Sequence, residues 1–496
     1  MRYTKEVDMK YFLAFDVGTT AMKCILYDKK FNEIFYANKE YSLDTREGGI
    51  AELDSEIYFD TFLECINELK QTSINFDEIV TITFTTQGET MIPVDKDGNA
   101  LMPAVVWLDT RAEKEAEDIS RAIDIKEFYE TTGLCGVDGA LPAAKIAWIR
   151  KNRPDVYDKT YKFLLLEDYL IYRLTGKFVS EKSLQSSTGW YDIVNDKLYE
   201  KLISVCKIDA EKLPEILPCG TVIGGIKSEI IERTALSENT AVVTGAMDQI
   251  ASAIGIGNTT EGMFSETTGT ALVVGITVTD PVFDLENPIT VYRHFDDKFI
   301  YMPYYSTAGI TLKWFRDNVM PYILKESEEK NIRSYDIIDQ EAAKSPAGSN
   351  GLVMLADLSA NGAFIGLNLS TKTSDMARSV MEGVAFMLRD IVEIVESRNI
   401  SIDKIYSLGG GSYSPLWRQI KADVCKKQIV CTDYAQTTAL GAAILGAVAV
   451  GEYQNVYDAL KMRNVNENVN LPNSENFEIY DKSYKKYIYF TKSLEV

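Results

Sequence analysis

The sequence predicts an α/β protein built from two related domains. Three observations lead to this prediction. The chain has 496 residues, which is more than one ordinary hydrophobic core accommodates. Strand-like and helix-like segments alternate along it, and a Gly-Thr turn between two strand-like runs opens each half. Hydrophobic residues make up 46% of the chain, enough to fill two such cores.

The first half begins with short apolar runs separated by turns, which is typical of a β-meander. Apolar residues at helical spacing then indicate an amphipathic helix, and another strand follows. The predicted strands cover residues 11–15, 22–27, 33–37 and 79–84, and the helix covers 55–70.

The same order returns in the second half, which suggests an internal duplication. Strands are predicted over 263–265, 272–278 and 404–408, and a long helix over 374–398. We place the boundary in the Gly- and Thr-rich stretch 255–262, so that the domains cover 1–256 and 257–496 with a catalytic cleft between them.

The composition restricts the partners. Lys and Arg number 52 against 73 Asp and Glu, so the formal charge is −21. Such a surface repels nucleic acids and anionic membranes, and neither is expected as a partner. The N-terminal residues carry charges where a secretory signal needs an apolar run, and residues 439–451 are too few to span a bilayer. We therefore expect a cytoplasmic protein.

Cysteine and histidine usage argues against zinc and against histidine-based nucleophilic catalysis. None of the seven cysteines belongs to a CxxC pair, and His294 is the single histidine of the sequence. Magnesium bound by carboxylates is the easier fit.

Two Gly-Thr turns are candidate phosphate-binding elements. In Asp16–Thr20, glycine allows close approach, backbone N–H groups and threonine hydroxyls supply donors, Lys23 adds a positive charge, and Asp16 is placed to hold magnesium through water. Thr267–Thr270 is the second turn. For either turn, an ordinary hairpin is the alternative interpretation.

A third glycine-rich segment, Gly409–Ser412, lies between a predicted strand and a helix that Ser414 caps and Pro415 begins. Three glycines leave a flat surface for an adenosine, although a turn that needs positive φ is the alternative. The sequence contains neither GxxxxGK[ST] nor GxGxxG.

Asp248 follows a strand and small residues at the predicted start of a helix. It is a candidate base that faces an attacking hydroxyl, and a helix-capping aspartate is the alternative. Amide, acidic and aromatic residues on loops of the first half are suited to a polyhydroxylated ligand. They are Gln87, Glu89, Trp107, Asp109 and Arg111, of which the last two are also a possible plain salt bridge.

Together these features resemble the FGGY carbohydrate kinases of the actin/Hsp70/sugar-kinase superfamily. The motifs occur in the family's order: FDVGTTAMK (15–23), WLDTR (107–111), LTG (174–176) and SSTG (186–189), TGAMDQIASAIG (244–255), ETTGTA (266–271), ANGAFIGLNL (360–369) with MEGVAF (381–386), and LGGGSYSPLWRQIKADV (408–424).

The resemblance implies two ribonuclease-H-like (actin-like ATPase) domains that bind ATP, Mg²⁺ and a sugar or polyol. It implies that Asp248 is the catalytic base and that Asp248 and Gln249 contact the acceptor. The implied nucleotide-binding residues are Gly18, Thr19, Thr20, Lys23, Thr268, Gly269, Thr270, Gly309, Lys313, Gly410, Gly411 and Ser412, and the implied magnesium ligands are Asp16 and Asp248.

The acceptor is predicted to be a ketopentose such as xylulose. Family xylulose kinases have Gln-Met-His where this chain has Gln87-Gly88-Glu89, and glycerol kinases have Gln-Arg-Glu-Thr. The segment Gln87-Gly88-Glu89-Thr90 matches neither pattern completely, so glycerol, erythritol and gluconate are alternative acceptors. The sequence also leaves open whether the chain forms a homodimer. The alternatives of another class are a non-catalytic actin- or Hsp70-like ATP switch and a sugar-sensing protein without transfer.

Overall fold

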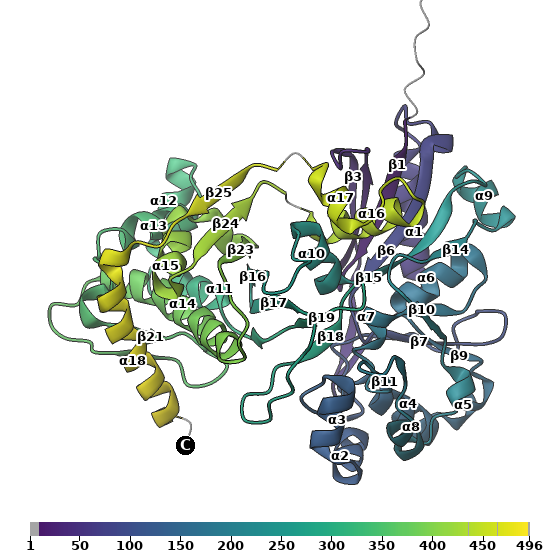
Figure 1. Cartoon of the computed structure of the whole chain (residues 1–496), viewed down its shortest axis with the longest axis horizontal. Coiled ribbons are helices and arrows are strands. Elements are labelled where there is room, and N and C mark those ends of the chain that lie inside the picture. The colour runs from purple at the N-terminus through teal and green to yellow at the C-terminus, as the bar shows by residue number, and fades with distance from the viewer. Residues whose placement is uncertain (1–8, 435, 464, 495–496) are drawn as a thin grey trace, which may run out of the picture. The chain divides into compact units, whose positions relative to one another are not determined.

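The structure is a computed structural model that describes residues 9–434, 436–463 and 465–494. The chain forms two compact units, which are described separately below (Figure 1). Unit 1 comprises Met1–Thr259, Thr279–Ile300 and Tyr434–Asn464, as far as these are described, and unit 2 comprises the rest.

Unit 1 is built on a six-stranded sheet in the order β14-β15-β6-β1-β2-β3. β1, β2 and β3 form the expected antiparallel meander, whereas β1, β6 and β15 run parallel to one another. Parallel strands present their carboxyl ends at one edge of a sheet, which is where ligands bind in α/β folds. The edge at β1, β6 and β15 is therefore the place to look for a site.

The strands of unit 1 are β1 (Tyr11–Val17), β2 (Ala21–Tyr27), β3 (Glu33–Glu40), β4 (Asp44–Arg46), β5 (Ile50–Leu53), β6 (Ile79–Thr86), β7 (Met91–Val94), β8 (Ala104–Val105), β9 (Lys162–Leu165), β10 (Val179–Glu181), β11 (Tyr191–Asp192), β12 (Lys197–Leu198), β13 (Glu215–Leu217), β14 (Val222–Gly224), β15 (Ala241–Met247) and β18 (Val291–Arg293); β19 (Phe299–Tyr301) lies where the chain leaves this unit. Its helices are α1 (Ser55–Leu69), α2 (Glu113–Ala122), α3 (Ile125–Thr132), α4 (Pro142–Asn152), α5 (Pro154–Lys159), α6 (Leu166–Thr175), α7 (Lys182–Gln185), α8 (Glu200–Cys206), α9 (Ser228–Thr234), α10 (Asp248–Ile256), α16 (Thr437–Ala449) and α17 (Val456–Lys461).

The core of unit 1 has a layer on each face of this sheet. Leu13 and Phe15 of β1 belong to one buried cluster with Phe62 of α1 and Leu170 of α6. On the other face, α16 packs against β1, β6 and α10 (Figure 1). The contact between α10 and α16 is so close that a Cβ at Gly441 would lie 1.8 Å from the Ala251 carbonyl oxygen.

The position of α16 corrects the predicted domain boundary at 256/257. The chain does divide near Thr259, but Thr279–Ile300 and Tyr434–Asn464 belong to unit 1. α16 is apolar nearly all round and buried along most of its length, so it needs a core on several sides. The sheet of unit 1 supplies that core, and the sequence contains no local signal for this return.

Unit 2 repeats the sheet topology of unit 1. Its strands run in the order β17-β16-β23-β24-β25, and β20 pairs with β17. β16, β17 and β20 are joined by antiparallel pairs, β16, β23 and β24 are parallel, and β25 closes the sheet in antiparallel direction. This is the pattern of β1, β2, β3, β6, β15 and β14, so the expected internal duplication is confirmed.

The strands of unit 2 are β16 (Phe264–Thr268), β17 (Leu272–Val278), β20 (Tyr304–Tyr305), β21 (Val353–Leu355), β22 (Ala363–Ile365), β23 (Lys404–Leu408), β24 (Gln428–Thr432) and β25 (Glu467–Asn470). Its helices are α11 (Gly309–Asn318), α12 (Tyr322–Lys330), α13 (Ser334–Ala342), α14 (Thr373–Ser397), α15 (Pro415–Cys425) and α18 (Phe477–Leu494), with a 3₁₀ turn over Gly410–Tyr413. Among the described residues, the structure has no helix that combines the length and the hydrophobicity of a membrane span.

Candidate active site

Three predicted site residues stand at the carboxyl ends of the parallel strands of unit 1. Asp16 is the penultimate residue of β1, Gln87 follows β6 directly, and Asp248 follows β15 and begins α10. β6 lies between β1 and β15, with Asp16 opposite Thr85 and Met247 opposite Thr86. The topology thus gathers residues that are far apart in the sequence at one sheet edge.

Asp248 combines burial with a nearby negative charge. Its side chain is half-buried, and the backbone N–H of Gln249 donates to Oδ1 at 2.6 Å. Burial, followed by the charge of Asp16, raises the pKa of Asp248 to about 7. A carboxylate with this pKa is suited to accept a proton near neutral pH. The side chain of Gln249 is exposed beside it.

Asp16 and Lys23 face each other across the β1–β2 hairpin. They are direct cross-strand neighbours, and Lys23 Nζ lies 3.2 Å from Asp16 Oδ2. Lys23 therefore compensates the charge of Asp16 in this structure.

The Gly18–Thr20 turn is tied to the loop after β6, which carries Gln87 and Glu89, and to the loop that carries Trp107. The Gly18 N–H donates to the Ala21 carbonyl at 2.9 Å. The Thr19 hydroxyl donates to Gln87 Oε1 at 2.7 Å and accepts the indole N–H of Trp107 at 2.9 Å. Thr19 thereby fixes Gln87 and Trp107, while the next residue of the turn, Thr20, is exposed.

Trp107 and Glu89 are the accessible members of the residues that the sequence predicts to bind a polyhydroxylated ligand. The Trp107 residue is 38% exposed although its indole N–H is hydrogen-bonded, so part of the residue remains accessible. Glu89 is half-buried and has φ 61°. A non-glycine residue in this left-handed region is often part of a functional site. Burial raises the pKa of Glu89, and the charges of Asp138 and Asp248 add to the rise.

Lys145 of α4 supports the loops that carry Glu89 and Trp107, and the sequence analysis missed it. Its Nζ donates to the carbonyls of Glu89 at 3.2 Å and Val106 at 2.9 Å, and the residue is 1% exposed. Burial lowers the pKa of Lys145, and the charge of Glu89 opposes this. The available signal was a lysine inside the apolar helical stretch of residues 142–149.

Asp109 and Arg111 form the plain salt bridge that the sequence left open. Arg111 Nε and Nη2 donate to Asp109 Oδ1 and Oδ2 at 2.8 and 2.6 Å, and the Ala51 N–H also donates to Oδ2. Asp109 is 0% exposed, and Arg111 also pairs with Glu52. Because protein groups occupy both carboxylate oxygens, these residues support the Trp107 loop in this structure, and their contact with the ligand stays a prediction.

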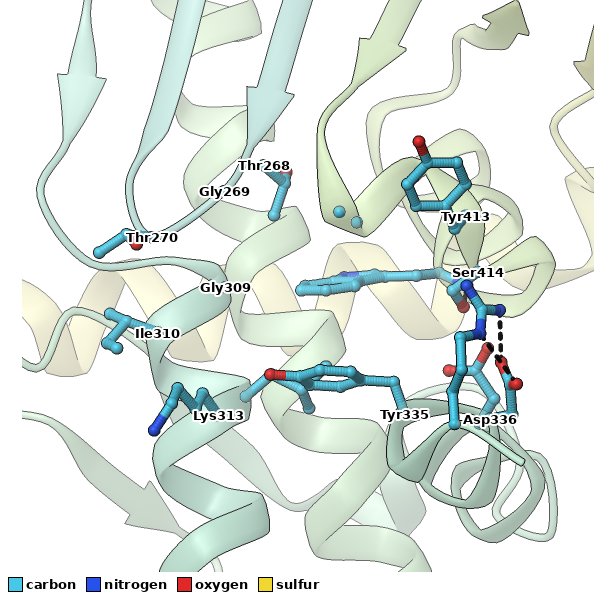
Figure 2. A pocket seen from close by; sticks show the side chains of 16 residues that line it. Thr268, Gly269, Thr270, Gly309, Ile310, Lys313, Tyr335, Asp336, Tyr413 and Ser414 are labelled. Carbon is cyan, nitrogen blue, oxygen red and sulfur yellow. Dashed lines mark hydrogen bonds and ion pairs between the residues drawn. The ribbon is translucent and has the colours of Figure 1, made fainter. Parts of the chain in front are cut away.

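Unit 2 contains a pocket of about 290 Å³ beside the second Gly-Thr turn (Figure 2). Thr270, Ile310 and Lys313 lie along one side of the view, and Tyr335 and Tyr413 lie along the other. The pocket brings together seven predicted nucleotide-binding residues, which are Thr268, Gly269, Thr270, Gly309, Lys313, Gly410 and Gly411.

Two glycines shape this pocket in different ways. A Cβ at Gly309, the first residue of α11, would lie 2.1 Å from the Gly269 carbonyl oxygen, so the turn and the helix touch only because Gly309 has no side chain. A Cβ at Gly410 would have no atom within 4 Å, because this glycine faces open space. Lys313 pairs with Asp317 at 2.7 Å.

Ser412 does not line the pocket, although the sequence predicted that it binds the nucleotide. It is 5% exposed, and its hydroxyl donates to the Gly409 carbonyl at 2.7 Å. The side chain stabilises the glycine turn from inside, which corrects that prediction.

Aromatic and acidic residues form the rest of the wall, and the sequence analysis missed them. Tyr335 and Tyr413 (Figure 2) supply apolar surface together with Trp417. Arg333 pairs with Asp336 at 2.6 Å. Burial raises the pKa of Asp339. Tyr413 and Trp417 fall within the 408–424 motif but were not singled out there as site residues. Arg333 and the α13 residues Tyr335, Asp336 and Asp339 belong to no motif, so tertiary packing alone identifies them.

The acidic residues of unit 1 are better suited to magnesium than to a metal ion whose ligands all come from the protein. Among the described residues, no group of three or more His, Cys, Asp or Glu side chains could hold a metal ion. Magnesium is commonly bound by one or two carboxylates together with substrate phosphates. Asp16 and Asp248 satisfy that smaller requirement.

Comparison with known proteins identifies the family. The N-terminal domain model of the FGGY family of carbohydrate kinases matches residues 11–255, and the C-terminal domain model matches residues 265–450. The chain belongs to the FGGY family of carbohydrate kinases. It is thus an ATP-dependent sugar phosphotransferase, and the predicted family and enzyme class are confirmed.

Relatives of this carbohydrate kinase cover nearly its whole length. A xylulose kinase of Lactococcus lactis subsp. lactis is 28% identical over 96% of this chain and 95% of its own. A gluconokinase of Bacillus subtilis is 26% identical over 91% and 89%. The crystal structure of a ligand-bound xylulose kinase from Lactobacillus acidophilus matches with a TM-score of 0.89, 26% identity and 98% coverage of both chains. These matches confirm the predicted actin-like ATPase fold.

Proposed function

We propose that this kinase transfers the γ-phosphoryl group of ATP to a primary hydroxyl of a ketopentose, with xylulose as the first candidate. The observation that carries the proposal is Asp248. This half-buried carboxylate follows the carboxyl end of β15, and its charge acts on Glu89, whose backbone is left-handed. Trp107, which is partly exposed, is held by Thr19 of the first Gly-Thr turn. A sugar needs hydrogen-bonding groups for its hydroxyls and an apolar face for its C–H groups, and these residues supply both.

In this proposal, Asp248 accepts the proton of the attacking hydroxyl, which contributes about 10²–10⁴ in rate. Glu89 and Gln249 hydrogen-bond the acceptor, and Trp107 packs against it. Gln87 is 4% exposed and holds Thr19. We therefore give Gln87 the role of fixing the first Gly-Thr turn.

The pocket of unit 2 is proposed to hold the nucleotide. Tyr335, Tyr413 and Trp417 offer apolar surface for the base. Gly410 and Gly411 leave space for the ribose, and Thr270 and Lys313 provide donors for the phosphates. Asp16 and Asp248 would hold Mg²⁺, which neutralises charge on the transferred phosphoryl group when it is bound.

The choice of a ketopentose rests on the relatives and on the acceptor loop. Similar proteins include xylulose kinases and gluconokinases. Gluconate is the second candidate. It is an anion, and Arg111, the cation of the WLDTR segment, already pairs with Asp109 and Glu52. An anionic acceptor would have to find another partner, so we rank it below a neutral sugar. We expect the reaction to take place in the cytoplasm, where ATP is available.

The test is ADP release from Mg-ATP, coupled to a second enzyme, across D-xylulose, D-ribulose, L-ribulose, L-xylulose, gluconate, glycerol and erythritol. We expect saturable turnover with one ketopentose. Asp248→Asn should lower kcat by at least about 10²-fold without loss of ADP binding. Asp60→Asn, an exposed position on α1, is the matched control and should behave like the wild type.

The outcomes separate the alternatives. Turnover with gluconate or a polyol alone would replace the proposed acceptor and keep the mechanism. ADP release that no acceptor stimulates would favour an ATP switch. Near-wild-type turnover by Asp248→Asn would overturn the role of Asp248.

A further inference from the structure

A buried ion pair lies beneath the second Gly-Thr turn. Lys421 of α15 and Glu266 of β16 are joined by a contact of 2.6 Å between Nζ and Oε1, and both side chains are 0% exposed. Thr268, which lines the nucleotide pocket, stands two residues after Glu266. The charges therefore lie directly behind the wall of the proposed ATP site.

Hydroxyl groups complete this network. Lys421 Nζ also donates to Thr268 Oγ1 at 2.8 Å, and the Thr268 hydroxyl donates to Glu266 Oε2 at 2.7 Å. The Ser407 hydroxyl of β23 donates to Glu266 Oε1. Both carboxylate oxygens of Glu266 and the hydroxyl proton of Thr268 thus take part in hydrogen bonds within the protein.

Stability alone does not account for such a pair. Removing two charges from water is costly, and charge-free replacements of similar volume are often as stable as a buried ion pair or more so. What the pair provides is geometry, because it joins β16, β23 and α15 at one point. A Cβ at Gly411 would lie 2.8 Å from the Thr268 Cβ, so a small shift of Thr268 would change the glycine surface of the pocket.

The same helix joins the network to another pocket wall. Trp417 lines the pocket one helical turn before Lys421, and the Lys421 ammonium lies 5.2 Å from the centre of its ring. A movement of Lys421 would therefore displace Thr268 and Trp417 together.

We propose that Lys421, held by Glu266, is a positioning residue for the nucleotide phosphates. It acts through Thr268, whose hydroxyl is an internal anchor and not a phosphate donor. The network holds the turn in its binding geometry before ATP arrives, which reduces the ordering cost of binding. This inference rests on the proposed function of the pocket.

The experiment compares the wild type with the charge-free double variant Glu266→Gln/Lys421→Met. ADP affinity is measured by titration calorimetry, and KM is measured for Mg-ATP and for the acceptor. We expect a thermal midpoint near or above that of the wild type. We also expect ADP affinity to fall and KM for Mg-ATP to rise by about tenfold, with acceptor KM within about twofold.

A second buried ion pair of unit 2 is the matched control. Arg378 Nε lies 2.8 Å from Glu382 Oε1 on α14, and neither residue lines the pocket. Arg378→Met/Glu382→Gln should leave KM for Mg-ATP unchanged, whatever it does to stability. If the Lys421 double variant does not fold, Ser407→Ala removes one hydrogen bond to Glu266 and should raise KM for Mg-ATP by about two- to threefold.

A folded double variant with wild-type ADP affinity would overturn the inference and leave the proposed function intact. An equal loss of ADP affinity in the control pair would also overturn it, since that result indicates a general loss of structure. A wild type that binds neither ADP nor ATP would overturn both this inference and the proposed function.

Discussion

Asp16, near the carboxyl end of β1, and Asp248, directly after β15, lie at one edge of the sheet on either side of β6. This placement couples their charges. Burial and the charge of Asp16 together raise the pKa of Asp248 to about 7. The two carboxylates at this edge thus differ, because Asp16 is paired with Lys23 whereas the pKa of Asp248 is raised.

The first prediction concerns the pH dependence of the reaction. Asp248 must be ionised to accept a proton, so kcat/KM for the acceptor should rise about tenfold per pH unit below pH 7 and level off above it. Asp16→Asn removes a negative neighbour, which lowers the pKa of Asp248, so the half-maximal point of the residual activity should move to lower pH. Asp60→Asn should not move it, and an unmoved profile in Asp16→Asn would contradict the coupling.

The second prediction concerns Lys145. Lys145→Met leaves the carbonyls of Glu89 and Val106 without their donor, which should cost about 1–3 kcal/mol of stability. Because these carbonyls belong to the loops that we propose bind the acceptor, acceptor KM should rise more than KM for Mg-ATP. Lys151→Met is the control on the same helix, where a half-exposed lysine pairs with Glu115, and it should change stability by less than about 1 kcal/mol. Equal changes in both KM values would refute the assignment.

The third prediction uses two glycines of the pocket that we propose binds the nucleotide. Gly309→Ala places a methyl group against the Gly269 carbonyl, which should destabilise the protein by about 1–3 kcal/mol and weaken ADP binding. Gly410→Ala meets no protein atom and should change stability by less than about 0.5 kcal/mol. It should nevertheless weaken ADP binding, since its methyl group enters the pocket. Thermal unfolding and calorimetry with ADP distinguish the two effects, and unchanged ADP binding in Gly410→Ala would place the nucleotide elsewhere.

The fourth prediction concerns stability as a function of pH. Asp168 of α6 is 0% exposed, accepts the Leu165 N–H at 2.9 Å, and has a pKa that burial raises to about 8. The folded chain therefore favours the neutral acid, and this contribution is lost as pH rises from about 4 to about 8, by up to about 1.4 kcal/mol per pH unit.

Asp168→Asn keeps the shape of the side chain but removes the carboxyl group that titrates. Its thermal midpoint relative to the wild type should increase steadily between pH 5 and pH 8. Asp158→Asn, at an exposed position of α5, should show no such trend. A constant difference between Asp168→Asn and the wild type would indicate that Asp168 does not titrate in this range.

Several features were accessible from the sequence because they are local. Alternating apolar runs predicted β1, β2, β3 and β6, and helical spacing predicted α1 and α14 within about two residues. The Ser414–Pro415 pair predicted the start of α15, and Ser414 does cap it, accepting the Trp417 N–H at 3.0 Å. The motifs also identified the family, since their order is a property of the sequence itself.

The tertiary structure decided which of the predicted polar residues face a ligand. Asp109 and Ser412 occur in the expected motifs, yet both direct their oxygens into the protein. Lys145 belongs to no recognised motif, and Lys421 lies in the 408–424 motif without having been predicted as a site residue. Both are nevertheless buried in contact with predicted site residues or their loops. Whether a polar side chain faces a ligand depends on which groups, distant in the sequence, hydrogen-bond with it once it is buried. The packing of the folded chain determines those partners, and neighbouring residues in the sequence do not.

The sequence by itself determined the fold class, the duplication and the motif positions, because backbone periodicity and turn chemistry act over a few residues. Only the tertiary structure decided that α16 returns to unit 1, that three strand ends place Asp16, Gln87 and Asp248 at one edge, and that Asp248 has a pKa near neutrality. These properties arise from desolvation and from contacts between segments more than 60 residues apart in the chain, and no local pattern encodes them.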